Sequence, residues 1–149
     1  MTSAGELMNW VLMPFRRVLD YSGRSRRREY WLFALFALVL VLLVGRLPQA
    51  ISNNFGSLLI IGLAVPGLAV TVRRLHDVGR SGWWIAMPIV PFLFWAVALV
   101  GGFSSEVLFH VIMPIVILAP FALAALLLFD GNRGPNAYGP DPKNLPEGL

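Results

Sequence analysis

The sequence Arg73-Arg74-Leu75-His76-Asp77-Val78-Gly79-Arg80-Ser81-Gly82-Trp83-Trp84 is a charged segment between two long apolar runs. We call residues 73–84 the island. Each flanking run has about 20 residues, and a helix of that length spans about 30 Å, the thickness of the hydrocarbon core of a bilayer. The island therefore predicts a short polar connection between two helices that cross a membrane.

The composition of the whole chain agrees with a membrane protein. Of the 149 residues, 57% are hydrophobic and 13% are charged. In soluble domains about half of the residues are hydrophobic and about a quarter are charged. The chain has no cysteine, which excludes disulfides, thiolate metal sites and cysteine nucleophiles. The net charge of +4 is accompanied by no nucleic-acid recognition motif, so we expect it to reflect cytoplasmic loops and not nucleic-acid binding.

The hydropathy pattern predicts one all-α membrane domain over residues 1–149 with four transmembrane helices. They are expected at about 26–46, 57–78, 82–100 and 107–129, joined outside the membrane by loops at 47–56 and 101–106. An amphipathic segment at about 5–21 is expected to lie in the membrane interface or to pack on the cytoplasmic loops, and a polar tail covers 130–149.

Local signals add detail to these helices. Ser25 and Ser81 stand where helix N-caps are expected, and Arg73 and Arg74 are expected to extend to the membrane surface. Prolines interrupt three of the four spans, which is typical of kinked packing helices and also of the broken helices in transporters. These prolines are Pro66, Pro88, Pro91, Pro114 and Pro120.

The distribution of basic residues predicts the orientation. Eleven of the twelve lie on the side of the termini and the island, and Arg46 alone lies on the other. By the positive-inside rule, both termini and the island are cytoplasmic. Three polar segments are then expected to meet at the cytoplasmic face: the approach to the first span, the island, and the tail from residue 130.

These three segments carry a specific set of motifs. The motif residues are Gly23, Arg24, Arg27, Glu29 and Trp31 in the approach; Arg74, His76, Asp77, Gly79, Arg80, Ser81, Gly82 and Trp83 in the island; and Gly134, Asn136, Tyr138, Gly139, Asp141 and Pro142 in the tail. The set resembles the family catalogued as domain of unknown function 805, over roughly residues 10–142. The resemblance implies a multi-pass, four-helix protein of the bacterial inner membrane and implies no activity.

The titratable residues do not form a recognisable catalytic or metal site. Neighbouring residues on a helix point about 100° apart, so His76 and Asp77 cannot form a close dyad. The tail spaces its oxygens like a calcium loop, but Pro135 occupies the place of the turn glycine and Asp141 replaces the bidentate glutamate. We expect no metal, no cofactor and no catalytic residue. Instead, Asp77 and Glu29 should pair with arginines, and His76 should bond a backbone carbonyl.

The leading functional hypothesis is a non-enzymatic protein that binds anionic lipid headgroups, or a partner subunit, at its cytoplasmic surface. The candidate binding residues are Arg24, Arg27, Arg73, Arg74, His76, Asp77, Arg80 and Ser81, beside a structural cluster of Glu29, Trp31, Trp83, Asn136, Tyr138 and Asp141. A small transporter or channel is the alternative, followed by an enzyme that acts on a lipid phosphate with His76 as acid or base. A homo-oligomer is also compatible with the small residues of the helices.

Overall fold

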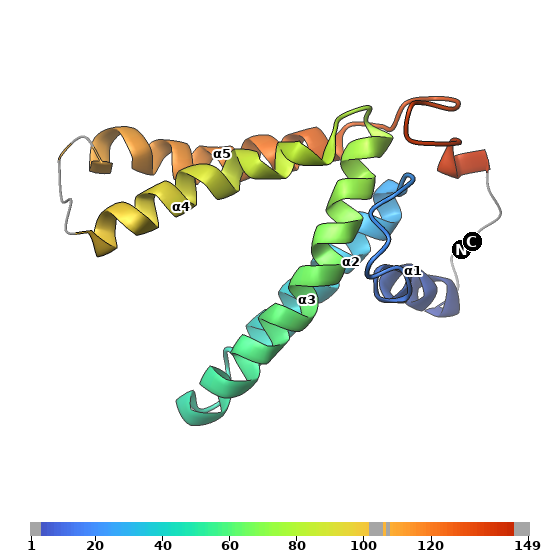
Figure 1. Cartoon of the computed structure of the whole chain (residues 1–149). Coiled ribbons are helices and arrows are strands. Elements are labelled where there is room, and N and C mark those ends of the chain that lie inside the picture. The colour runs from blue at the N-terminus through green and yellow to red at the C-terminus, as the bar shows by residue number, and fades with distance from the viewer. Residues whose placement is uncertain (1–3, 102–105, 107, 145–149) are drawn as a thin grey trace.

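The computed structural model describes residues 4–101, 106 and 108–144, and its regular elements in this part of the chain are helices (Figure 1). The prediction of an all-α protein is confirmed. The elements are α1 (Ala4–Arg16), α2 (Arg27–Val44), α3 (Gln49–Asp77), the 3₁₀ turn η1 (Gly82–Ile85), α4 (Ala86–Val100), the π-helical turn η2 (Leu108–Ile112), α5 (Met113–Leu128) and the 3₁₀ turn η3 (Pro142–Asn144).

The long helices form two hairpins. Helices α2 and α3 pack side by side, α4 and α5 do the same, and α1 lies across α2 (Figure 1). The two hairpins diverge from one end, where the island joins α3 to α4 and the tail leaves α5. This end of the molecule, which we call the polar junction, gathers the three polar segments that the sequence predicted to meet.

The surface of the hairpins suits a lipid environment. The buried core of the protein is small, with Phe33, Leu63 and Val70 at its centre. Many large apolar side chains of α2 to α5 are exposed. Among the described residues, three helical stretches are long and apolar enough to cross a membrane, namely Phe55–Asp77, Gly82–Val100 and Phe109–Leu128. The chain is therefore an α-helical membrane protein with several candidate spans.

Helix α2, the first expected span, is shorter than the other candidates. It has 18 residues, and its first turn contains Arg27, Arg28 and Glu29. The 15 residues that remain reach about 22 Å at about 1.5 Å per residue, which is less than the thickness of about 30 Å of a hydrocarbon core.

The connection between α2 and α3 is shorter than expected. The sequence predicted a loop at 47–56, but α3 already begins at Gln49. Pro48 stands at the N-cap position of α3, and its carbonyl accepts a hydrogen bond from the backbone N–H of Ile51 at 2.9 Å. Since proline favours the first positions of a helix, the helix starts directly after it. The second expected loop, at 101–106, lies largely outside the described residues, as do residues 145–149 of the tail.

The prolines of the spans have different consequences. Pro66 is buried within a continuous α3, whereas Pro114 stands in the first turn of α5, directly after the π-helical turn η2. Ser81 precedes η1, but its side chain makes no capping hydrogen bond, so the expected side-chain cap of the third span is absent. The sequence predicted Ser25 at the N-cap position of α2, but Arg26 occupies this position.

The apolar side chains of helix α1 have different environments along its length. Trp10 and Pro14 are buried against the protein, and the ring of Phe15 meets that of Phe33 edge-on at 5.5 Å between centroids. Leu7 and Met8, in the earlier turns, are exposed. Packing on the protein and contact with the membrane interface, which the sequence left as alternatives, therefore suit different parts of the same helix.

Candidate functional site

The polar junction is built on two adjacent arginines at the end of α3. Arg73 and Arg74 have no exposed surface, so they do not extend to the membrane surface as the sequence predicted. Adjacent side chains on a helix point about 100° apart, so the two guanidinium groups reach different neighbours. A buried guanidinium is stable only when its donors are paired, and both arginines have several internal partners.

Arg73 ties α3 to the connection between α1 and α2. Its Nη2 lies 3.0 Å from the Glu29 carboxylate, and its Nη1 donates to the carbonyl oxygens of Arg17, at 3.0 Å, and of Asp20. Ser25 completes this group, because its hydroxyl donates to Glu29 and its N–H donates to the Arg73 carbonyl at 3.1 Å. Ser25 thus orients a buried carboxylate.

Arg74 ties the same helix end to α5. Its Nε donates to the Leu127 carbonyl at 3.2 Å, and its Nη2 donates to the Phe129 carbonyl. The last carbonyls of a helix have no partner within the helix and carry the negative end of its dipole, so a cation there both caps and neutralises α5. The remaining terminal nitrogen of Arg74 pairs with Asp77.

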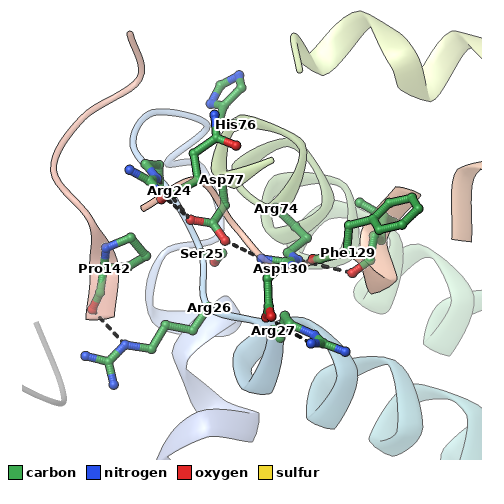
Figure 2. A network of polar contacts seen from close by, with 12 residues as sticks. Arg24, Ser25, Arg26, Arg27, Arg74, His76, Asp77, Phe129, Asp130 and Pro142 are labelled. Atoms are coloured by element: carbon green, nitrogen blue, oxygen red, sulfur yellow. Dashed lines mark hydrogen bonds and ion pairs between the residues drawn. The ribbon is translucent and has the colours of Figure 1, made fainter. Parts of the chain in front are cut away.

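Asp77 stands between two guanidinium groups, as Figure 2 shows. One carboxylate oxygen accepts from Arg24 Nε at 2.9 Å, and the other pairs with Arg74. Arg24 then donates to the backbone carbonyls of Gly134, at 2.6 Å, and of Asn132. One carboxylate on α3 therefore joins the approach, the island and the tail.

The tail returns over the island through His76. The ring of Tyr138 stacks on the ring of His76, with centroids 3.9 Å apart and planes inclined by 4°. His76 Nδ1 lies 3.1 Å from the Gly23 carbonyl, and the side-chain amide of Asn136 donates to the His76 carbonyl at 2.9 Å. The predicted pairing of Asp77 and Glu29 with arginines, and of His76 with a carbonyl, is confirmed.

Asp141 and Asp20 fix the backbone on either side of the junction. Asp141 accepts from the N–H groups of Lys143, at 2.9 Å, and of Gly134, at 3.0 Å, and these bonds lower its pKa against the effect of burial. For Asp20, burial opposes ionisation, but hydrogen bonds from Ser22 and Arg17 outweigh it and lower the pKa to about 2. Both side chains act here as ionised turn-forming groups.

The eight residues predicted for binding are divided by the structure. Arg24, Arg73, Arg74 and Asp77 are buried in the network, with His76 half-buried beside them. The other three lie outside it: Arg27 pairs with Asp130 at 2.9 Å, Arg80 lies over the Trp84 ring at 5.0 Å, and Ser81 precedes η1. The candidate residues therefore do not form a single open site.

The predicted structural cluster is also divided. Glu29, Asn136, Tyr138 and Asp141 belong to the junction through the bonds given above. Trp31 instead lies within α2, where its ring meets Tyr30 edge-on at 5.1 Å. Trp83 is 85% exposed on the first turn of the third span, the position of an interfacial anchor and not of a cluster member.

A basic recess lies at the rim of the junction, and the sequence did not predict that its residues come together. Arg26, Arg27, Arg28 and Lys143 line a hollow of about 490 Å³. Asp130 lies 2.9 Å from Arg27 and 3.9 Å from Lys143, so its carboxylate faces two of the four cations. The run Arg26-Arg27-Arg28 was the signal in the sequence, but the approach of Lys143 from the tail has no local signature.

The described residues contain no group of three histidine, aspartate or glutamate side chains that could hold a metal ion. In the junction, the carboxylates of Asp77 and Glu29 accept hydrogen bonds from guanidinium groups and a hydroxyl. The network holds segments of the chain together, whereas Arg27, Arg28 and Lys143 of the basic recess are exposed.

Fold and junction together define a helical membrane protein that joins its helix ends through a buried network of arginines and carboxylates. Its family follows from comparison with known proteins. The family model described as "Protein of unknown function (DUF805)" matches residues 18–140, and the chain belongs to this family.

Relatives in Escherichia coli K12 match over most of their length. The chain is 31% identical to the inner membrane protein YhaH over 93% of this chain and 100% of the relative. It is 33% identical to the inner membrane protein YhaI over 91% of this chain and 97% of that relative. No solved structure matches the chain. With these relatives and its apolar helices, the chain is a multi-pass protein of the inner membrane.

The buried position of Asp77 predicts a large effect of removing its charge. In Asp77→Asn, two buried guanidinium groups lose their shared carboxylate, so we expect a loss of about 3 kcal/mol of stability. The measurement is chemical denaturation in detergent micelles followed by circular dichroism. Asp130→Asn is the matched control, because its exposed pair with Arg27 should contribute little. Equal effects of the two substitutions would contradict the structural role of Asp77.

Gly131 lies against the same carboxylate, and a Cβ there would overlap Asp77. We expect Gly131→Ala to displace Asp77 from its two arginines and to lower the midpoint of thermal unfolding. Gly62→Ala is the control, since a Cβ at Gly62 meets no atom within 4 Å and alanine favours a helix. If Gly131→Ala melts like wild type, the close packing of the tail on Asp77 is wrong.

Proposed function

We propose that this chain is a non-enzymatic, four-span membrane protein that binds anionic phosphate headgroups at its cytoplasmic surface through the basic recess. The supporting observation is a hollow lined by Arg26, Arg27, Arg28 and Lys143, with the Asp130 carboxylate beside two of these cations. The approach to the first span and the tail both contribute to it, so the recess exists only when the polar junction is assembled.

The proposal has both termini in the cytoplasm, with α2 crossing the membrane beside α3. Contact with α3 along the hairpin supports this path for α2, despite its short apolar length. The charged first turn of α2 then stays at the surface, where arginine side chains reach the headgroups. The excess of basic residues at the junction end supports a cytoplasmic position by the positive-inside rule.

The recess suits a ligand better than the buried arginines do. The guanidinium groups of Arg24, Arg73 and Arg74 are occupied by internal carboxylates and carbonyls. Recess side chains are more accessible, with 44% of Arg27 and 56% of Lys143 exposed. In the proposed topology, Arg26, Arg27 and Arg28 at the start of α2 are at headgroup depth, which favours a lipid phosphate over a partner subunit.

The orientation can be tested by cysteine labelling, because the chain has no cysteine of its own. We expect Asn144→Cys to react with a membrane-impermeant maleimide only in inverted inner-membrane vesicles. Leu47→Cys, at the opposite end of α2, should react only in right-side-out spheroplasts. Both residues are exposed, so accessibility within the protein does not limit the reaction. Labelling of both from the same side would exclude the proposed path of α2.

Headgroup binding can be tested in a neutral detergent with phosphatidylglycerol as the anionic probe and phosphatidylcholine as its uncharged counterpart. Each basic residue near the phosphate should contribute about 1 kcal/mol, or about fivefold in affinity. Arg28→Ala combined with Lys143→Ala should therefore weaken phosphatidylglycerol binding by about 30-fold, measured from ligand-dependent thermal stability.

Two variants control for general charge effects. Arg46→Ala removes an exposed arginine from the far end of the molecule and should leave the affinity unchanged. Asp130→Asn removes the carboxylate beside the recess and should strengthen binding. Soluble glycerol phosphate separates recognition of phosphate alone from recognition of a lipid. If Arg46→Ala weakens binding as much as the double variant does, the recess is not the binding site.

A further inference from the structure

An apolar groove runs between α2 and α3 below the basic recess. Its volume is about 440 Å³, and its lining includes small residues on both helices, namely Ala34 and Ala37 on α2 and Ala64 and Gly67 on α3. Larger side chains at these positions would close the space between the helices. The groove is thus a consequence of small residues facing one another along the hairpin.

The groove begins at the junction end of the hairpin. Tyr30, in the first turns of α2, and Thr71, near the end of α3, line this end, and Val41 and Ile60 line the other. From Tyr30 to Val41 the helix rises by about 16 Å, at about 1.5 Å per residue. This length is about half of a hydrocarbon core of about 30 Å, which is the depth of one leaflet.

The helical register places the recess at the mouth of the groove. Arg27 precedes Tyr30 by three positions and Ala34 by seven, and residues with this spacing share one face of a helix. A cationic rim thus stands over an apolar channel that has the depth of a leaflet. An anionic phospholipid has the complementary arrangement, with a phosphate at its head and a hydrocarbon chain below.

We infer that the α2–α3 hairpin is the binding site of one anionic phospholipid of the inner leaflet. Its phosphate lies at the basic recess, and one acyl chain lies in the groove. The inference rests on the proposed headgroup binding and extends it, because it requires the acyl chain as well as the phosphate. A second copy docked by the same face is disfavoured, since it would bring two basic recesses together.

Filling the groove tests the inference. Native mass spectrometry of the protein in neutral detergent should show one retained phosphatidylglycerol on wild type. Ala34→Phe fills the groove and should lower this occupancy by at least tenfold. Leu35→Phe is the matched control, because Leu35 is on the same helix, is 57% exposed and lies outside the groove lining. It should retain the lipid as wild type does.

Two comparisons separate this inference from the proposed function. Ala34→Phe should still bind soluble glycerol phosphate like wild type, whereas Arg28→Ala with Lys143→Ala should lose both ligands. If Ala34→Phe keeps its phosphatidylglycerol while the double variant loses it, the acyl chain does not lie in the groove, and the proposal of headgroup binding stands. If neither variant loses the lipid, both proposals fail.

A second groove variant guards against misfolding. Ala64→Leu narrows the groove from α3 with a smaller side chain at an exposed position, and it should reduce lipid occupancy in the same direction. Circular dichroism verifies that each variant is folded. If wild type is a dimer in these spectra and Ala34→Phe makes it monomeric, a second copy occupies the groove and the inference is overturned.

Discussion

The Asp77 carboxylate, held between the guanidinium groups of Arg24 and Arg74, is the interaction on which the rest of the polar junction depends. Charges removed from water are stable only when paired and hydrogen-bonded. Each arginine of the network therefore also donates to backbone carbonyls at segment ends. A guanidinium suits this task because its five donors in a rigid plane can bond a carboxylate and several carbonyls, whereas a lysine ammonium has only three donors.

The junction separates two uses of positive charge. Buried arginines neutralise carboxylates and cap carbonyls, and they connect the two hairpins at the end where these meet (Figure 1). The arginines and lysine of the recess remain at the rim, where the Asp130 carboxylate lies beside Arg27 and Lys143. The motif residues that most resemble an active site, His76 and Asp77, thus hold the chain together, and the less distinctive arginine run faces outward.

The sequence predicted those features that depend on residue type and local pattern. Long apolar runs predicted the helices, and the arginines and carboxylates of the three polar segments predicted that Asp77 and Glu29 would pair with arginines. The pair of Arg24 with Asp77 was not predictable, because the two residues are separated by 53 positions. The loop predicted at 47–56 lies where α3 already runs, since the helix begins directly after Pro48. The contact of Gly131 with Asp77 depends on how the tail folds back, which no local signal encodes.

The sequence separation of the network has a consequence for biosynthesis. Arg24 donates to Gly134, 110 positions later, and Arg74 donates to Leu127, 53 positions later. Chains emerge from the ribosome with the N-terminus first, so the first hairpin is made well before these acceptors exist. Until then, Asp77 is shared by two arginines whose other donors need water. The arrival of the last segment completes their pairing, so the polar junction can close only after the second hairpin has been made.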